Sequence, residues 1–105
     1  MTSSEFSYIF ENPIKSADSA YTVLARVNST GNSRLGVIVS KKNISSAVKR
    51  NRMKRIVRES FRLHKTNINS LDVVVICKKN SERIVNKKLF KQLDKHWKLI
   101  NEQGQ

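Results

Sequence analysis

Residues 45–62 read SSAVKRNRMKRIVRESFR. It contains no Gly or Pro, and Ser45 or Ser46 can cap it, which predicts a helix over residues 47–64. At about 100° per residue, one side carries the residues expected to pack on a sheet: Met53, Ile56, Val57, Ser60 and Phe61. The opposite side carries what we call the basic stripe: Asn51, Lys54, Arg55, Arg58 and Arg62.

The charge of this stretch is one-sided. It holds seven Lys or Arg residues against a single acid, Glu59. Like charges at helical spacing each cost about 0.2 to 0.5 kcal/mol. The whole chain is also strongly basic, with 21 Lys and Arg against 8 Asp and Glu and a formal net charge of +13. Such a chain attracts polyanions, so nucleic acid is the first candidate partner and an anionic membrane surface is the second.

Two stretches before the basic helix are predicted to be strands. Residues 21–27 (YTVLARV) alternate with the period of two that marks a strand, and residues 34–40 (RLGVIVS) form a second such run. Residues 28–33 (NSTGNS) have the composition of a turn, so we expect the two strands to pair as a hairpin. Residues 14–16 could add a short edge strand.

The elements farther from the basic helix are predicted in the same way. Residues 71–77 (LDVVVIC) are too apolar for an edge and indicate a buried central strand. Residues 86–101 repeat apolar residues at helical spacing with lysines outside, which predicts an amphipathic helix. A short helix is expected from Ser3 or Ser4 to Phe10, because the residue before Pro13 is pushed out of the helical region.

The order of these elements predicts the fold class. Because 105 residues make one small domain, residues 1–105 are expected to share a single core. The order helix, three strands, helix, strand, helix (αβββαβα) describes a two-layer α+β sandwich. The basic helix then lies on the crossover between the predicted hairpin and the strand at residues 71–77.

The residues argue against a self-sufficient enzyme. A magnesium-dependent nuclease needs clustered carboxylates, but the eight acids are spread singly along the chain. His64 and His96 have no second His or Cys at ligand spacing, and the three Gly residues form no phosphate-binding loop. Cys77 lies inside an apolar run and is expected to be a buried, reduced thiol. Without a signal peptide pattern or a long apolar stretch, the chain is expected to be cytoplasmic.

Aromatic residues near the start offer a second candidate surface. Phe6 and Phe10 lie one helical turn apart, and exposed rings can stack on unpaired bases for about 1 to 3 kcal/mol each. The residues alone favour both rings in the core, with Tyr8 as the alternative exposed ring.

The residues around the basic helix resemble a known family. RLGVIVSKKNISSAVKRNRMKRIVRESFR, residues 34–62, is similar to the signature of the bacterial ribonuclease P protein subunit. Its hallmark is an RNR core followed by KR, RE and FR, which here are residues 50–52, 54–55, 58–59 and 61–62. The resemblance extends more loosely to FSYIF at residues 6–10 and LDVVVICKK at residues 71–79.

The resemblance implies a function. In this family a catalytic RNA with bound Mg²⁺ removes the 5′ leader from precursor tRNA, and the protein assists without cleaving alone. Contacts to the catalytic RNA would fall on Lys41, Lys42, Lys49, Arg50, Asn51, Arg52, Lys54, Arg55, Arg58 and Arg62. A cleft between the first helix and the sheet would hold the leader through Phe6, Phe10, Leu24, Arg26 and Ile38. This implication overrides the preference for Phe6 and Phe10 as core residues.

The resemblance also implies the remaining expectations. The fold would be ribosomal protein S5 domain 2-like, with a left-handed crossover at the basic helix. Mg²⁺ would act through the RNA, with no protein ligand site. The partners would be the catalytic RNA and precursor tRNA, with no membrane and no required protein partner. The alternative is a general RNA-binding or ribosomal protein without a leader-binding role.

Overall fold

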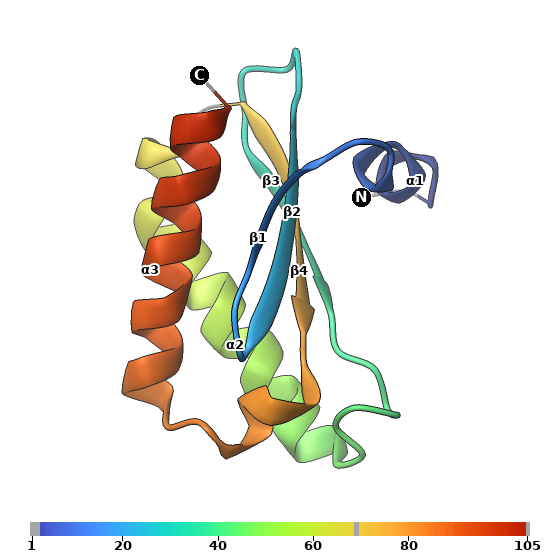
Figure 1. Ribbon diagram of the computed structural model, residues 1–105, viewed down its shortest axis with the longest axis vertical. Helices are drawn as coiled ribbons and strands as arrows, with labels where there is room; N and C mark the ends of the chain where they lie inside the picture. The colour runs from blue at the N-terminus through green and yellow to red at the C-terminus, as the bar shows by residue number, and fades with distance from the viewer. Residues whose placement is uncertain (1–2, 69, 105) are drawn as a thin grey trace.

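The computed structural model describes residues 3–68 and 70–104 (Figure 1). In chain order the elements are α1 (Ser3–Phe10), β1 (Ile14–Ala17), β2 (Tyr21–Val27), β3 (Arg34–Ile38), α2 (Ala47–His64), the 3-10 helix η1 (Lys65–Asn67), β4 (Leu71–Cys77), the 3-10 helix η2 (Lys79–Arg83) and α3 (Asn86–Gln103). This order confirms the α+β class and the predicted αβββαβα sequence of elements. Three boundaries differ, because β1 continues to Ala17, β3 ends at Ile38 and α3 continues to Gln103.

The four strands form one mixed sheet in the order β1-β2-β4-β3. Strand β2 pairs antiparallel with both β1 and β4, whereas β3 pairs with β4 in parallel. The predicted hairpin of residues 21–27 with residues 34–40 is therefore wrong, since β4 lies between these two strands. The edge strand at residues 14–17 is instead the one that forms a hairpin with β2.

The polar loop at residues 28–33 explains why β4 can lie between β2 and β3. The Asn28 backbone N–H donates to the Ser70 carbonyl over 2.7 Å, and the Ser33 hydroxyl donates to the Ile68 carbonyl. The loop thus crosses the start of β4 and forms hydrogen bonds with Ile68 and Ser70, which precede this strand. Since six of the seven residues of β4 are buried, placing this strand between two others also pairs its backbone on both sides.

Helices α2 and α3 cover one face of the sheet, which we call the inner face (Figure 1). Val23, Val73 and Val75 from the strands meet the buried sides of both helices in the main core. The predicted buried side of α2 is confirmed, and its Phe61 ring meets Trp97 of α3 edge to face at 5.7 Å. The Trp97 indole N–H donates to the Ser60 hydroxyl over 2.8 Å, which satisfies both buried polar groups.

Buried polar groups also attach α3 to the β1–β2 hairpin. His96 is 3% exposed, with the Ser16 hydroxyl 2.6 Å from its Nδ1 and an Asp18 carboxylate oxygen 2.8 Å from its Nε2. Asp18 also accepts the backbone N–H groups of Ala20 and Tyr21. Burial acts to raise the pKa of Asp18, but these hydrogen bonds outweigh it, so the pKa is lowered. His96 therefore organises the interior of the protein.

Helix α1 lies on the other face of the sheet, which we call the outer face (Figure 1). Its Ile9 is fully buried and packs with Leu24 of β2 and Val74 of β4. The strand registers place three rows of side chains on this face. From one end to the other the rows are Arg26–Asp72–Arg34, Leu24–Val74–Gly36 and Thr22–Ile76–Ile38. Ile9 seats α1 on the middle row and leaves the two outer rows on its flanks.

The packing of α2 gives a first prediction. Phe61→Ala should lower the free energy of unfolding by about 3 to 5 kcal/mol, because it removes a buried ring and leaves a cavity beside Trp97. Leu63→Ala on the same helix is the matched control, since Leu63 is 59% exposed and should change stability by about 0.5 kcal/mol or less. Urea denaturation followed by circular dichroism measures both. Equal losses in the two variants would contradict the assignment of faces.

The Arg34–Asp72 ion pair gives a second prediction. Two hydrogen bonds from Arg34, of 2.8 and 2.6 Å, hold the pKa of Asp72 below its ordinary value of 3.8 against the opposing effect of burial. The stabilisation from this lowered pKa is present above pH 3.8 and is lost as the pH falls below it. Asp72→Asn should cost about 1 to 2 kcal/mol at neutral pH, a value reduced by solvent screening of the 38% exposed Arg34 side chain.

Urea denaturation of both proteins across the acid range tests this prediction. The difference in stability between wild type and Asp72→Asn should shrink as the pH falls below the ordinary carboxyl value. A difference that is constant with pH would mean that the ionised carboxylate is not what stabilises the strand pair.

Candidate nucleic-acid interface

Helix α2 positions the candidate interface by burying its opposite side. Ser46 is the N-cap, and its hydroxyl accepts the Lys49 backbone N–H over 3.3 Å, as the sequence predicted. The buried side then fixes the rotation of the helix about its axis. The basic stripe consequently faces away from the core along the C-terminal two thirds of α2.

The basic stripe lines one shallow depression, together with Glu59. Arg62 is paired with Glu59 across 2.6 Å, and both side chains are largely exposed. Within the described part of the chain, Lys54, Arg55 and Arg58 make no side-chain hydrogen bond or ion pair. These three cations repel one another without an internal partner among the described residues, so the depression carries net positive charge.

The cations at the N-terminal end of α2 form hydrogen bonds or ion pairs with other groups of the protein. Arg50 donates to the carbonyls of Ile44 and Ser45 over 3.0 and 2.7 Å. Arg52 donates to the Glu82 carbonyl over 3.4 Å, and Lys49 pairs with the Glu82 carboxylate over 2.8 Å. The predicted RNA-binding set therefore divides into cations that also hold the fold and cations that do not.

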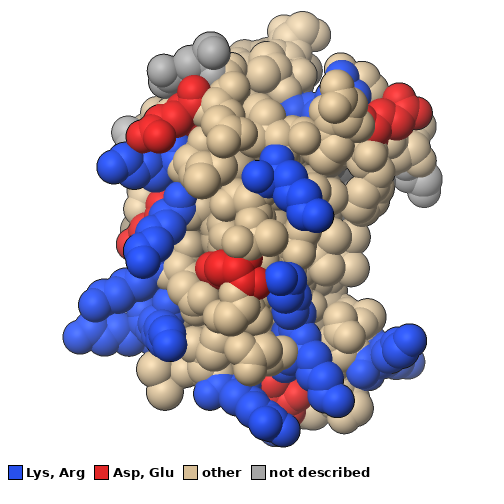
Figure 2. Space-filling model, in the orientation of Figure 1, with Lys and Arg blue, Asp and Glu red and all other residues tan. Residues whose placement is uncertain are grey.

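Other exposed basic residues lie beside α2 and on α3. Lys41 and Lys42, which the resemblance implied, are exposed in the turn that precedes α2. Lys79 and Arg83 of η2 border a depression beside Lys49, a contribution that the sequence analysis missed because η2 has no periodic pattern. Figure 2 shows Lys and Arg atoms along α3 as well, whose exposed lysines are Lys87, Lys88, Lys91, Lys95 and Lys98.

The residues predicted to bind the leader do not all form one surface. Phe10 is 48% exposed, which agrees with a ring outside the core, whereas the Phe6 side chain lies outside the described residues. Leu24 is only 7% exposed because Ile9 covers it. Ile38 is partly buried in the same cluster, next to Ile76.

Arg26 has a structural function at the end of α1. Its guanidinium donates to the carbonyls of Tyr8 and Glu11 over 3.1 and 2.6 Å, and its Cζ atom lies 3.9 Å from the centre of the Tyr8 ring. Since α1 has no basic residue in its last turn, Arg26 supplies the positive charge that stabilises a helix C-terminus. It therefore lies on the Tyr8 flank of α1, apart from Ile38.

Other kinds of site find little support in the described residues. No three His, Cys, Asp or Glu side chains there gather closely enough to hold a metal ion. None of the helices described is both long and apolar enough to cross a bilayer. The buried Cys77 thiol, whose pKa burial raises to about 12, is unreactive near neutral pH.

A two-layer α+β fold whose central helix presents a basic side, with Lys54, Arg55 and Arg58 unpartnered among the described residues, has the features expected of the class of small basic nucleic-acid-binding proteins. Comparison with known proteins identifies the family. The family model described as Ribonuclease P matches residues 1–101, and the chain belongs to this ribonuclease P protein family.

The similar proteins agree with this assignment. The ribonuclease P protein component of Pseudoalteromonas translucida is 43% identical over 102 residues, which cover 97% of this chain and 73% of the relative. That of Methylococcus capsulatus is 44% identical over 96 residues, covering 91% and 75%. Among solved structures, the RNase P protein of Staphylococcus aureus superposes with a TM-score of 0.85 at 29% identity, covering 96% of this chain and 95% of that one. The Thermotoga maritima protein gives 0.80 at 33% identity, covering 90% and 89%.

The division of cations along α2 gives a third prediction. Arg55→Ala and Arg58→Ala should each weaken binding of a structured RNA and reduce the slope of log K against log salt by about one unit, with little change in stability. Arg50→Ala should instead lower stability by about 1 kcal/mol or more, because two carbonyls lose their donor. Fluorescence anisotropy over a salt series measures the slopes, and urea denaturation measures the stabilities.

Lys98→Ala on α3 is the charge-matched control for this series. It removes one positive charge from a different helix and should leave the salt slope nearly unchanged. If Arg58→Ala unfolds the protein, or if Lys98→Ala changes the slope as much as Arg55→Ala does, the basic stripe is not the main contact.

Proposed function

We propose that this chain is the protein subunit of ribonuclease P that binds the catalytic RNA through the basic stripe and the 5′ leader of precursor tRNA on the outer sheet face. The observation that carries the proposal is the set of cations on α2 without an internal partner among the described residues: Lys54, Arg55 and Arg58. Arginine's planar fork can grip a phosphate with two hydrogen bonds, which suits a ribose-phosphate backbone.

The flank of α1 that bears Phe10 is where we place the leader. Tyr8 and Phe10 are two residues apart, so they leave α1 in nearly opposite directions. Tyr8 lies with Arg26, which puts Phe10 on the flank next to the row Thr22–Ile76–Ile38. All three residues of this row are partly exposed, so an unpaired strand can lie along it and stack one base on Phe10.

This proposal revises the contacts that the resemblance implied. Ile38 and Phe10 remain, and Ile76 joins them because the sheet register places it beside Ile38. Leu24 packs against Ile9 of α1, and Arg26 donates to carbonyls at the end of α1, so we assign both residues a role in positioning this helix.

Magnesium belongs to the RNA in this proposal. In its support, Asp72, Glu59 and Glu82 are each paired with a basic side chain, and Asp18 lies against His96. Positive charge on the protein would lower the Mg²⁺ concentration that the complex requires, since it offsets phosphate repulsion between the two RNAs. The purified chain without RNA is expected to cleave nothing.

A general RNA-binding protein would share the basic stripe, but it would not need the exposed Phe10 ring beside the row Thr22–Ile76–Ile38, in which two of the three residues are apolar.

The fourth prediction separates the two functions. In the holoenzyme, affinity for precursor tRNA should exceed that for mature tRNA and should rise with leader length over the first few nucleotides. Phe10→Ala should reduce this advantage by about 5-fold or more, because one stacked base loses its ring.

Val85→Ala is the control, since Val85 is 68% exposed and lies at the start of α3. It should leave the leader advantage intact. Equal affinity for precursor and mature tRNA in the wild-type holoenzyme would favour the general RNA-binding function. Cleavage by the RNA-free chain would contradict the proposed division of labour.

A further inference from the structure

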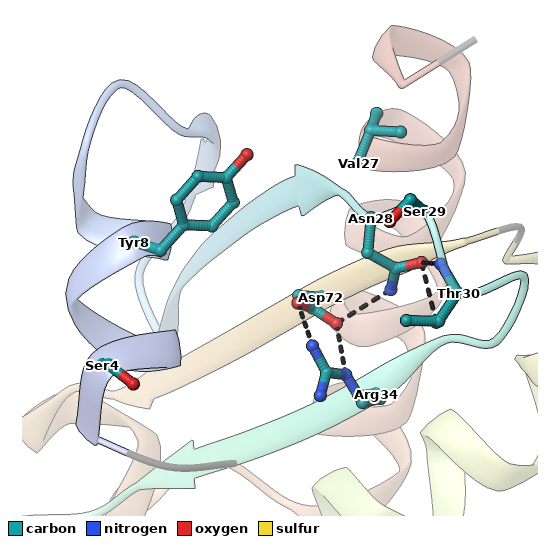
Figure 3. Close-up of a pocket in the computed structure, with 8 residues that line it drawn as sticks. All are labelled: Ser4, Tyr8, Val27, Asn28, Ser29, Thr30, Arg34 and Asp72. Carbon is teal, nitrogen blue, oxygen red and sulfur yellow. Dashed lines mark hydrogen bonds and ion pairs between the residues drawn. The ribbon is translucent and has the colours of Figure 1, made fainter.

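The Tyr8 flank of α1 borders a pocket that the proposed function does not use. An open cavity of about 520 Å³ lies between α1 and the loop that joins β2 to β3 (Figure 3). This volume falls within the range of small-molecule sites and can hold a nucleotide. The cavity stands over the Arg26–Asp72–Arg34 row, at the opposite side of α1 from Phe10.

The Tyr8 ring faces this cavity, and the Tyr8 side chain is 47% exposed. In Figure 3 the ring projects from α1 toward the loop that joins β2 to β3. That loop forms the opposite wall with Asn28, Ser29 and Thr30. A half-exposed aromatic ring beside an open cavity can stack on a flat ligand.

The Tyr8 ring is held in place before any ligand arrives. Arg26 lies 3.9 Å from the ring centre and donates to the Tyr8 and Glu11 carbonyls, so it fixes both the ring and the end of α1. A cation beside an aromatic ring also adds positive charge near the cavity. Little side-chain entropy would be lost when a base stacks on a ring already fixed in this way.

The far wall and the floor are also preformed. Asn28 accepts the backbone N–H and the hydroxyl of Thr30 through its Oδ1 and donates to Asp72 through its Nδ2. Asp72 is 4% exposed and is bound by Arg34, so the only acid in this part of the lining is compensated. The lining is therefore neutral overall, and Arg26 beside the Tyr8 ring adds one positive charge, which suits an anionic ligand with a flat apolar body.

We propose that this pocket binds one unpaired nucleotide of an RNA held elsewhere on the protein, with its base stacked on Tyr8. The inference rests on the proposed RNA-binding function and adds to it a second stacking site. Because α1 separates the two sites, a strand on the Phe10 flank does not occupy this one. The nucleotide could come from the catalytic RNA or from the precursor tRNA, and the experiment distinguishes them.

The fifth prediction uses three variants in the reconstituted holoenzyme. Tyr8→Ala removes the stacking ring, Tyr8→Phe keeps it, and Leu99→Ala removes an exposed apolar side chain from α3 on the inner side of the sheet. Tyr8→Ala should weaken binding by about 5-fold or more, whereas the other two variants should stay within about 2-fold of wild type. A loss in binding the catalytic RNA assigns the nucleotide to that RNA. A loss confined to precursor tRNA assigns it to the substrate.

A direct measurement on the wild-type chain covers the case in which Tyr8→Ala displaces α1. Titration with adenosine monophosphate, followed by amide NMR, should shift the signals of Tyr8, Val27 and Thr30 together. The same titration should shift the corresponding signals in Tyr8→Phe but not in Tyr8→Ala. The inference is wrong if only the signals of residues 38–42 shift, or if the signals of Tyr8, Val27 and Thr30 do not shift.

The result also separates this inference from the proposed function. If Tyr8→Ala binds both RNAs as wild type does while Arg55→Ala binds them weakly, the pocket is not a nucleotide site and the proposed function stands. If neither variant changes binding, both proposals fail.

Discussion

The burial of one side of α2 is the constraint on which the rest of the structure depends. Each large apolar side chain on that side, such as Met53 or Val57, contributes about 1.5 to 3 kcal/mol when it leaves water. Each pair of like charges on the other side costs about 0.2 to 0.5 kcal/mol. Packing therefore outweighs repulsion, and the basic stripe keeps its geometry without a bound anion.

The cations of α2 divide according to their position along the helix. Those near its start, Lys49, Arg50 and Arg52, bond to Glu82 or to the carbonyls before the helix and so fix the helix to its surroundings. Those farther along have no such partner among the described residues, apart from Arg62 with Glu59. The start of α2 is thus fixed to its surroundings by ion pairs and hydrogen bonds, and the rest of the helix presents Lys54, Arg55 and Arg58 from a fixed backbone.

On the outer face, Ile9 seats α1 on Leu24 and Val74, which leaves one row of the sheet on each flank of the helix. Tyr8 lies with Arg26 on the side of the charged row Arg26–Asp72–Arg34. In the proposed function, Phe10 lies on the other flank, beside the row Thr22–Ile76–Ile38. The two flanks differ in chemistry because the side chains of a strand alternate in direction while successive rows of the sheet differ in composition.

The helices, the strands, the rotation of α2 and the family can all be predicted from the amino-acid sequence. These features follow from local periodicity, from caps such as Ser46 and from a dense motif, each of which involves residues near one another in the chain. The period of 3.6 residues per turn also separates the buried side of α2 from its basic side.

Only the tertiary structure decided which strands are neighbours and which predicted contacts can reach a ligand. The turn composition of residues 28–33 indicated a hairpin, yet that loop bonds to Ser70 and Ile68, and β4 enters between β2 and β3. The burial of Leu24, the use of Arg26 to hold α1 and the pocket beside Tyr8 all follow from that strand order. Strand pairing joins residues far apart in the chain, and its free energy depends on burying β4 on both sides, which local patterns do not encode.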